Sequence, residues 1–249
     1  MTAPLAAALA AHQAGRLDQA EAGYRAVLAA EPDHADALHL LGVVRHQRGE
    51  DAEAVELIGR AIALKPGTYK YHYNLGAALQ GLGRPVEALE HYRMAASLAP
   101  PVTTVRLALG HLLHSLGRPA DAEPEFRRAI AEHPREAAAH AGLGATLHAL
   151  GRLEEAAASY RKAVEFHPED AAAHFTLGNV LQALGRLEEA EDAYRAALDR
   201  RPDHAPTLVN LGTVLHSQGR LDDAAGSHRQ ALKAQPDFAP AHLNLGAVL

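Results

Sequence analysis

The chain has 249 residues, of which 48% are hydrophobic, and it carries a formal net charge of −6 at neutral pH with no cysteine. Lysine and arginine do not cluster, which argues against a nucleic-acid groove, and the absence of cysteine excludes disulfides and thiolate catalysis. No apolar run approaches the roughly 18 residues that a membrane span needs, and the N-terminal segment lacks the positive stretch of a secretion signal. We therefore expect a cytoplasmic location and no membrane partner.

Proline and two sets of glycines recur along the chain with a period of 34 residues. The prolines are Pro32, Pro66, Pro100, Pro134, Pro168, Pro202 and Pro236. One set of glycines is Gly42, Gly76, Gly110, Gly144, Gly178, Gly212 and Gly246, and the other is Gly15, Gly49, Gly83, Gly117, Gly151, Gly185 and Gly219. A fixed period of this size predicts stacked supersecondary units instead of one globular core.

The register predicts a single solenoid of seven full repeats and the first part of an eighth. In chain order the repeats are 1–34, 35–68, 69–102, 103–136, 137–170, 171–204 and 205–238, followed by the partial repeat 239–249. We number the positions within each repeat as places 1 to 34. Each full repeat is predicted to form two antiparallel helices, so the expected fold is all-α with fifteen helices.

The repeat at 171–204 shows why two helices are expected. Leu177 and Gly178 belong to a set of residues spaced as on one face of a helix. Gly185 permits a left-handed cap after the first helix, and Pro202 prevents the second helix from continuing. Glycine at place 8 lets the two helices approach closely, so a bulky residue at Gly178 is predicted to overpack the contact and cost about 1–3 kcal/mol.

This pattern resembles the tetratricopeptide repeat. That family's pattern is an aromatic residue, Leu-Gly and a second aromatic residue, then Ala with an aromatic residue four places on, then Pro. The repeat at 137–170 matches it with His140, Leu143, Gly144, Leu147, Ala156, Tyr160, Ala163 and Pro168. The usual Trp at place 4 is often His in this chain. The resemblance implies a right-handed superhelix of helix hairpins.

Polar residues recur on one stripe of the first helices. In tetratricopeptide proteins this stripe lines the inner groove and holds extended peptides, and the resemblance implies the same role here. Place 12 is His or Gln in every full repeat, and both side chains can donate and accept hydrogen bonds. The row either contacts a ligand or is simply a solvated helix face.

We predict that an extended or helical protein segment binds along this stripe, which makes the chain a non-catalytic protein–protein interaction scaffold. Phe175 lies beside the small residues of the repeat at 137–170, which either accept a bulky ligand side chain or are Ala-rich because Ala is a good helix former. The candidate peptide-binding residues are His46, Asn74, Gln80, His111, His114, His148, Phe175, Asn179, Gln182, Asn210, His216 and Asn244.

The asparagines at place 6 also resemble the asparagine ladder in the repeat arm of the bacterial O-linked N-acetylglucosamine transferases. In that family the amides grip a peptide main chain. The match is partial, because Leu40, Ala108, Gly142 and Thr176 interrupt the ladder. An alternative hypothesis is therefore that the chain is the substrate-recruiting arm of a larger glycosyltransferase whose catalytic domain lies outside it.

Motifs of catalytic and metal sites are missing from the sequence. It has no phosphate-binding Walker loop, no His-Glu-x-x-His motif and no complete dinucleotide fingerprint, so we predict no catalytic residue and no cofactor. His111 and His114 lie one helical turn apart, with His148 one repeat further on, but no carboxylate or thiol stands at ligand spacing. We therefore predict no metal site.

The C-terminal segment 239–249 has the pattern of a first helix without its second helix. Either the natural chain continues beyond this segment, or the helix acts as a crude cap. In the second case its uncovered apolar side is a candidate surface for self-association.

Overall fold

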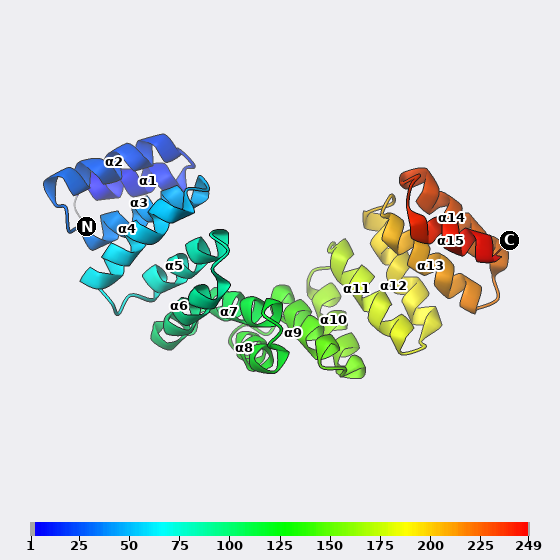
Figure 1. Cartoon of the computed structure of the whole chain (residues 1–249). Coiled ribbons are helices and arrows are strands. Elements are labelled where there is room, and N and C mark those ends of the chain that lie inside the picture. The colour runs from blue at the N-terminus through cyan, green and yellow to red at the C-terminus, as the bar shows by residue number, and fades with distance from the viewer. Residues whose placement is uncertain (1–2, 249) are drawn as a thin grey trace. The chain divides into compact units, whose positions relative to one another are not determined.

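The computed structural model describes residues 3–248, and all regular structure in that range is helical (Figure 1). Odd-numbered helices are the first helices of the repeats and even-numbered helices are the second. The first eight are α1 (Ala3–Gln13), α2 (Leu17–Ala30), α3 (Ala35–Gln47), α4 (Asp51–Leu64), α5 (Tyr69–Gly81), α6 (Pro85–Leu98), α7 (Thr103–Ser115) and α8 (Pro119–Glu132). The others are α9 (Ala137–Ala149), α10 (Leu153–Phe166), α11 (Ala171–Ala183), α12 (Leu187–Arg200), α13 (Ala205–Ser217), α14 (Leu221–Ala234) and α15 (Ala239–Val248). The prediction of fifteen helices is confirmed for the described residues.

The chain divides into two compact units, Met1–Gly117 and Arg118–Leu249. In the first unit α1 pairs with α2, α3 with α4 and α5 with α6, and α7 packs on α6. In the second unit α9 pairs with α10, α11 with α12 and α13 with α14, while α8 packs on α9 and α15 packs on α14 and α13. These hairpins confirm the helix pairs predicted for six of the seven repeats, and the fourth repeat contributes one helix to each unit.

The turn between the two helices of each repeat depends on the glycine at place 15. All seven of these glycines have φ between 69° and 79°, a left-handed conformation that costs other residues about 1–2 kcal/mol. At Gly185 the turn is closed by hydrogen bonds from its own N–H to the carbonyl of Gln182 and from the N–H of Arg186 to that of Leu181, at 3.0 and 2.9 Å. The predicted left-handed cap is confirmed.

The glycine at place 8 contacts the large side chain at place 24 of the second helix. A Cβ atom on Gly178 would lie 2.5 Å from Cε1 of Tyr194, which is fully buried. Gly76 has the same relationship to Tyr92, at 2.8 Å from its Cδ1. The close helix approach predicted from the small residues is therefore confirmed.

Where place 4 is histidine, its side chain connects the first helix to the loop that precedes it. In four repeats the imidazole Nε2 lies 2.8–2.9 Å from the carbonyl oxygen of the proline six residues earlier, and since that oxygen only accepts, Nε2 carries the proton. The four pairs are His72 with Pro66, His140 with Pro134, His174 with Pro168 and His242 with Pro236. A histidine that replaces Trp at place 4 thus satisfies the carbonyl of the proline that ended the previous repeat.

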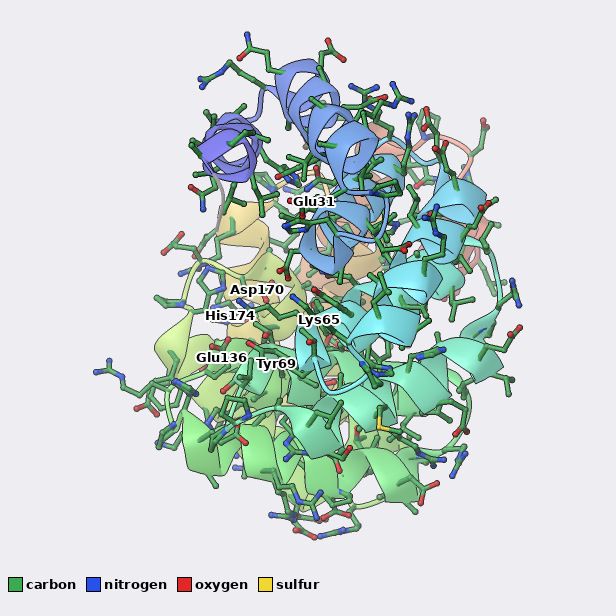
Figure 2. All side chains as sticks on the ribbon, turned by 90° about the vertical axis from the view of Figure 1, so that its left-hand side faces the viewer. Glu31, Lys65, Tyr69, Glu136, Asp170 and His174 are labelled. Carbon is green, nitrogen blue, oxygen red and sulfur yellow. The ribbon has the colours of Figure 1, made fainter. Side chains whose placement is uncertain are left out.

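The N-cap of α11 adds a second fixed point at one of these loops. Figure 2 labels Asp170 and His174 at the start of this helix. The carboxylate of Asp170 accepts hydrogen bonds from the N–H groups of Ala172 and Ala173 at 2.9 and 3.2 Å, which satisfies two otherwise unpaired donors of the first turn.

Charged side chains in the second unit lie on its second helices and their turns. Arg152 pairs with Glu123 of the preceding repeat at 2.8 Å, and Arg220 pairs with Glu191 in the same way at 2.8 Å. In contrast, α9, α11, α13 and α15 contain no Lys, Arg, Asp or Glu. The surface built by these first helices is therefore polar without formal charge when its histidines are neutral.

Helix α15 closes the described part of the chain. Ala241 is fully buried against Ala205, Leu208 and Val209 of α13, whereas Leu243 is 75% exposed. Leu245 is half-buried and Gly246 faces open space. Helix α15 therefore packs onto the seventh repeat mainly through Ala241, and Leu249 lies outside the described residues.

The first-helix faces as candidate functional site

Consecutive first helices within each unit lie next to one another. Helix α3 contacts α5, and α13 contacts both α11 and α15. At these seams a side chain at place 6 meets one at place 9 or place 5 of the preceding repeat. Nδ2 of Asn210 donates to Oδ1 of Asn179 at 2.8 Å, and Nδ2 of Asn244 donates to the Thr213 hydroxyl at 3.3 Å. Three asparagines predicted as binding residues thus line two neighbouring seams of the second unit.

The amide of Asn179 is held in one orientation by its surroundings. Its Oδ1 accepts a hydrogen bond from Nδ2 of Asn210 and lies within hydrogen-bond distance of the hydroxyl of Tyr194, both at 2.8 Å. The single proton of that hydroxyl is shared between Oδ1 of Asn179 and Oε1 of Gln182. Because Oδ1 is turned towards these two donors, the Nδ2 group points away from them. Nδ2 of Asn179 has no hydrogen-bond partner within residues 3–248, and the residue is half-buried. Asn179 therefore presents N–H donors at the surface of the first helices.

The side chains at place 12 have a structural partner that the sequence analysis did not identify. The hydroxyl of Tyr92 donates to Oε1 of Gln80 at 2.7 Å. The hydroxyl of Tyr194, whose one proton is shared with Asn179, lies 2.7 Å from Oε1 of Gln182. Both tyrosines stand at place 24, twelve residues after their partners. Each glutamine oxygen thus has a hydrogen-bond partner in its own repeat, while the N–H groups of both glutamines have no partner among the described residues.

Histidines at place 12 do not share one arrangement. In the repeat with Ile58 at place 24, Nδ1 of His46 contacts a carboxylate oxygen of Asp51 at 2.5 Å. His216 is exposed beside the buried His228. Nδ1 of His114 is buried, and no partner for it lies in the described part of the chain. His148 and His111 are exposed.

Asn74 is the first-unit member of the asparagine row. Its Nδ2 donates to Nε2 of His39 at 2.7 Å, so His39 is neutral with its proton on Nδ1. His39 is 6% exposed, and burial lowers its pKa to about 4, which agrees with the acceptor role. Its ring stacks on Tyr71 at 4.5 Å. Neither His39 nor Tyr71 was predicted as a site residue, because no polar residue type recurs at their places in the repeat.

A cleft of about 510 Å³ opens beside this cluster on the first-helix side of the first unit. Leu5, Leu9 and Leu40 form its apolar part, and Asp36 and Lys70 lie on its polar part. The carboxylate of Asp36 accepts hydrogen bonds from Lys65 at 2.9 Å and from the hydroxyl of Tyr71 at 2.5 Å. Burial alone would raise the pKa of Asp36, but these two bonds outweigh it and the pKa is lowered.

A smaller cavity of about 150 Å³ occupies the corresponding place in the second unit. Phe175 lines it and meets His204 edge-on, with ring centroids 5.4 Å apart. Phe175 is also 6.2 Å from the ring of Tyr194, so it lies next to the cluster of Asn179 and Gln182. The structure thus brings Phe175 together with three of the predicted amide residues, and their role in binding stays a prediction.

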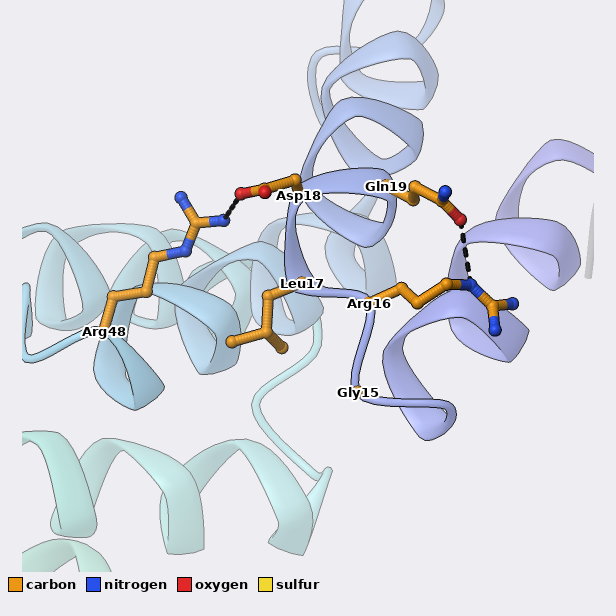
Figure 3. A pocket seen from close by; sticks show the side chains of 6 residues that line it. All are labelled: Gly15, Arg16, Leu17, Asp18, Gln19 and Arg48. Atoms are coloured by element: carbon orange, nitrogen blue, oxygen red, sulfur yellow. Dashed lines mark hydrogen bonds and ion pairs between the residues drawn. The ribbon is translucent and has the colours of Figure 1, made fainter.

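The pocket shown in Figure 3 differs from these two in its position. It lies at the turn between α1 and α2, where Arg48 pairs with Asp18 and Nε of Arg16 donates to Gln19 at 2.9 Å. Its polar groups satisfy one another, and it is separate from the asparagine row. Across residues 3–248 there is no cluster of three or more potential metal-ligating side chains and no helix long and apolar enough to cross a membrane.

Family models of the tetratricopeptide repeat match nearly the whole chain. One matches residues 5–67 and 107–171, a second matches residues 69–101 and a third matches residues 169–237. The chain belongs to the tetratricopeptide repeat family. Tetratricopeptide folds imply protein or peptide partners, so the coarse assignment as a protein–protein interaction scaffold follows from the family. The comparison with curated proteins gave no match.

Solved tetratricopeptide structures share the fold at low sequence identity. PilF of Pseudomonas aeruginosa is 19% identical, with a TM-score of 0.72 over 86% of this chain and 97% of that chain. A chain of the Cut9–Hcn1 hetero-tetramer of the APC/C is 17% identical, with a TM-score of 0.69 over 97% of this chain, which spans only 48% of that chain. YrrB, a tetratricopeptide protein with an unusual peptide-binding site, is 19% identical, with a TM-score of 0.53 over 88% of this chain and 96% of that chain. The likeness to O-linked N-acetylglucosamine transferases stays a prediction.

Proposed function

We propose that this chain is a non-catalytic scaffold that binds a protein segment along its first helices, mainly through the segment's main chain. The observation that carries the proposal is the orientation of Asn179 at the seam of α11 and α13. Its Oδ1 faces Asn210 and Tyr194, and its two N–H donors have no partner among residues 3–248. Gln182 adds further N–H donors one turn along α11, since its oxygen faces the hydroxyl of Tyr194.

These donors match the carbonyl groups of an extended or helical segment. A peptide offers carbonyl oxygens whatever its sequence, so fixed amide donors favour binding that tolerates many sequences. The absence of Lys, Arg, Asp and Glu from α9, α11, α13 and α15 supports this, because a neutral face neither selects nor repels charged side chains. YrrB, which shares the fold, is a precedent for a peptide site on such a scaffold.

The energies indicate that several contacts must act together. A neutral hydrogen bond contributes about 0.5–1.5 kcal/mol net, whereas micromolar affinity needs about 8 kcal/mol. Burial of an apolar ligand group against Phe175, which lines the neighbouring cavity, would contribute further binding free energy.

The test uses the whole chain and peptides displayed as internal segments. A library of displayed 12-residue peptides is selected on the protein, and the enriched peptides are synthesised with both ends blocked. Their affinities are measured by fluorescence anisotropy against the wild type and the double variant Asn179→Ala/Asn210→Ala. Loss of two contacts of this size predicts affinity lowered about 5- to 150-fold.

A matched control removes two amides elsewhere. Gln230→Ala/Gln235→Ala truncates two exposed side chains at α14 and its C-cap, and it should leave the affinity unchanged. Selection of no peptide, or equal affinities for the two double variants, would remove the amide row from the proposed function.

A further inference from the structure

The cleft on α1, α3 and α5 differs in its charge from the uncharged first helices of the second unit. Among these three helices the only Lys, Arg, Asp or Glu residues are Asp36, Arg45 and Lys70. Arg45 is buried and forms ion pairs with Glu21 and Glu50. Asp36 and Lys70 both line the cleft, so the accessible charges of these helices are concentrated there.

Only one of these two charges is unpaired. Asp36 is held by Lys65 and by the hydroxyl of Tyr71. Lys70 is exposed at the first turn of α5 and has no carboxylate partner among residues 3–248. His39, which also lines the cleft, is neutral near pH 7 because its Nε2 accepts from Asn74. The cleft therefore offers one free positive charge on a chain whose net charge is −6.

The other side of the cleft is apolar and large enough for a bulky side chain. Leu5 is buried, while Leu9 and Leu40 are half-exposed and face the same volume of about 510 Å³. Tyr71 closes the polar side; it is 2% exposed, and its hydroxyl is held by Asp36. Apolar walls with a few convergent polar groups are typical of binding pockets.

The cleft also adjoins the asparagine row. His39 lines the cleft on one side and accepts the hydrogen bond of Asn74 on the other. After this bond Asn74 still has one N–H and its carbonyl oxygen for a ligand main chain. A segment held at Asn74 would thus place a neighbouring side chain at the cleft.

We propose that this cleft is a specificity pocket for a protein segment, taking a bulky apolar side chain between Leu9 and Leu40 and an adjacent Asp or Glu at Lys70. The inference rests on the proposed function, because it takes the segment to be held by its main chain at the first helices, here at Asn74 of the first unit. It adds a sequence preference that the uncharged first helices of the second unit do not supply.

The experiment starts from the displayed 12-residue library, which presents internal segments without a free C-terminal carboxylate. Selected peptides should share a Leu, Ile, Met or Phe within two residues of an Asp or Glu. Lys70→Glu should lower the affinity of a blocked synthetic version about tenfold or more, because it reverses the charge opposite the ligand carboxylate. Changing that ligand acid to Lys should restore binding to the Lys70→Glu protein.

Control variants separate this pocket from general effects. Lys233→Glu makes the same change in net charge on α14 and should alter the affinity less than twofold. Leu40→Ala, at a half-exposed position, should weaken binding of the peptide with its apolar residue and have no effect on a peptide in which that residue is Ala. Far-UV circular dichroism checks that each variant is folded.

The outcomes distinguish this inference from the function on which it rests. Peptides that lack an acidic preference, or an unchanged affinity for Lys70→Glu, would overturn the pocket while the effect of Asn179→Ala/Asn210→Ala still supports the scaffold. A concentration-dependent dimer that Lys70→Glu dissociates would assign the cleft to a second copy of the chain and would also overturn the proposal.

Discussion

Nε2 of His39 on α3 accepts a hydrogen bond from Nδ2 of Asn74 on α5 at 2.7 Å, although the two residues are 35 positions apart in sequence. The bond joins a buried imidazole to a half-buried amide. It makes Asn74 both a structural residue and a candidate binding residue, so the two roles need separate measurements.

Asn74→Ala is expected to lower the free energy of unfolding by about 1–3 kcal/mol, because it leaves the buried Nε2 of His39 without a donor. Urea unfolding followed by circular dichroism measures the change. Asn244→Ala is the matched control, since its bond to Thr213 is longer, at 3.3 Å, and its partner is a hydroxyl that can turn to water. Equal losses for the two variants would contradict the structural role of Asn74.

Titration of His39 is expected to destabilise the protein in acid. Its pKa is about 4 in the folded chain and about 6.5 when unfolded, so the unfolded state binds more protons between these values. Stability contributed by neutral His39 is present above about pH 6.5 and is lost as the pH falls towards 4, by up to about 3 kcal/mol. The free energy of unfolding is measured for the wild type and for His39→Gln near pH 7 and near pH 4.5. The wild type should lose more stability between these pH values than the variant, and the difference between the two losses is the contribution of His39 titration. A difference of zero would show that His39 does not titrate in this range.

Gly178→Ala and Gly226→Ala are expected to change stability in opposite directions. A Cβ on Gly178 would lie 2.5 Å from Cε1 of Tyr194 in a packed interface, which predicts a loss of about 1–3 kcal/mol. A Cβ on Gly226, in the middle of α14, meets no atom within 4 Å, so better helix propensity predicts a gain of up to about 1 kcal/mol. Thermal unfolding of both variants measures the pair, and a destabilised Gly226→Ala would argue against the packing of α14.

Tyr194→Phe is expected to lower the free energy of unfolding by about 0.5–1.5 kcal/mol, since the hydroxyl shares its one proton between Asn179 and Gln182. Because Asn179 then loses one of the bonds that orient its amide, peptide affinity should fall as well. Tyr160→Phe serves as control, because its hydroxyl makes no hydrogen bond to the described residues and its removal should be nearly neutral. A fall in stability without any fall in affinity would mean that the orientation of Asn179 is irrelevant to binding.

Sequence alone determined the repeat, the helix pairs and the turns. Their physical requirements are local: a left-handed glycine such as Gly185, a helix-ending proline such as Pro202, and a small residue such as Gly178 facing a large one. These requirements recur every 34 residues, so the same residue types return at the same places and can be recognised in the sequence. The polar stripe of the first helices was found in the same way, because its places share one helical face.

Only the tertiary structure decided what each polar side chain contacts. The period places Gln182 and Asn179 on one stripe, but it gives no sign that both amide oxygens face the hydroxyl of Tyr194, or that place 9 of one repeat meets place 6 of the next. Likewise His39, Tyr71 and Lys70 have no shared motif, and they come together because helices from successive repeats pack side by side. Hydrogen bonds and clefts depend on distances between separate helices, and a periodic sequence specifies those distances only through the packing of the folded repeats.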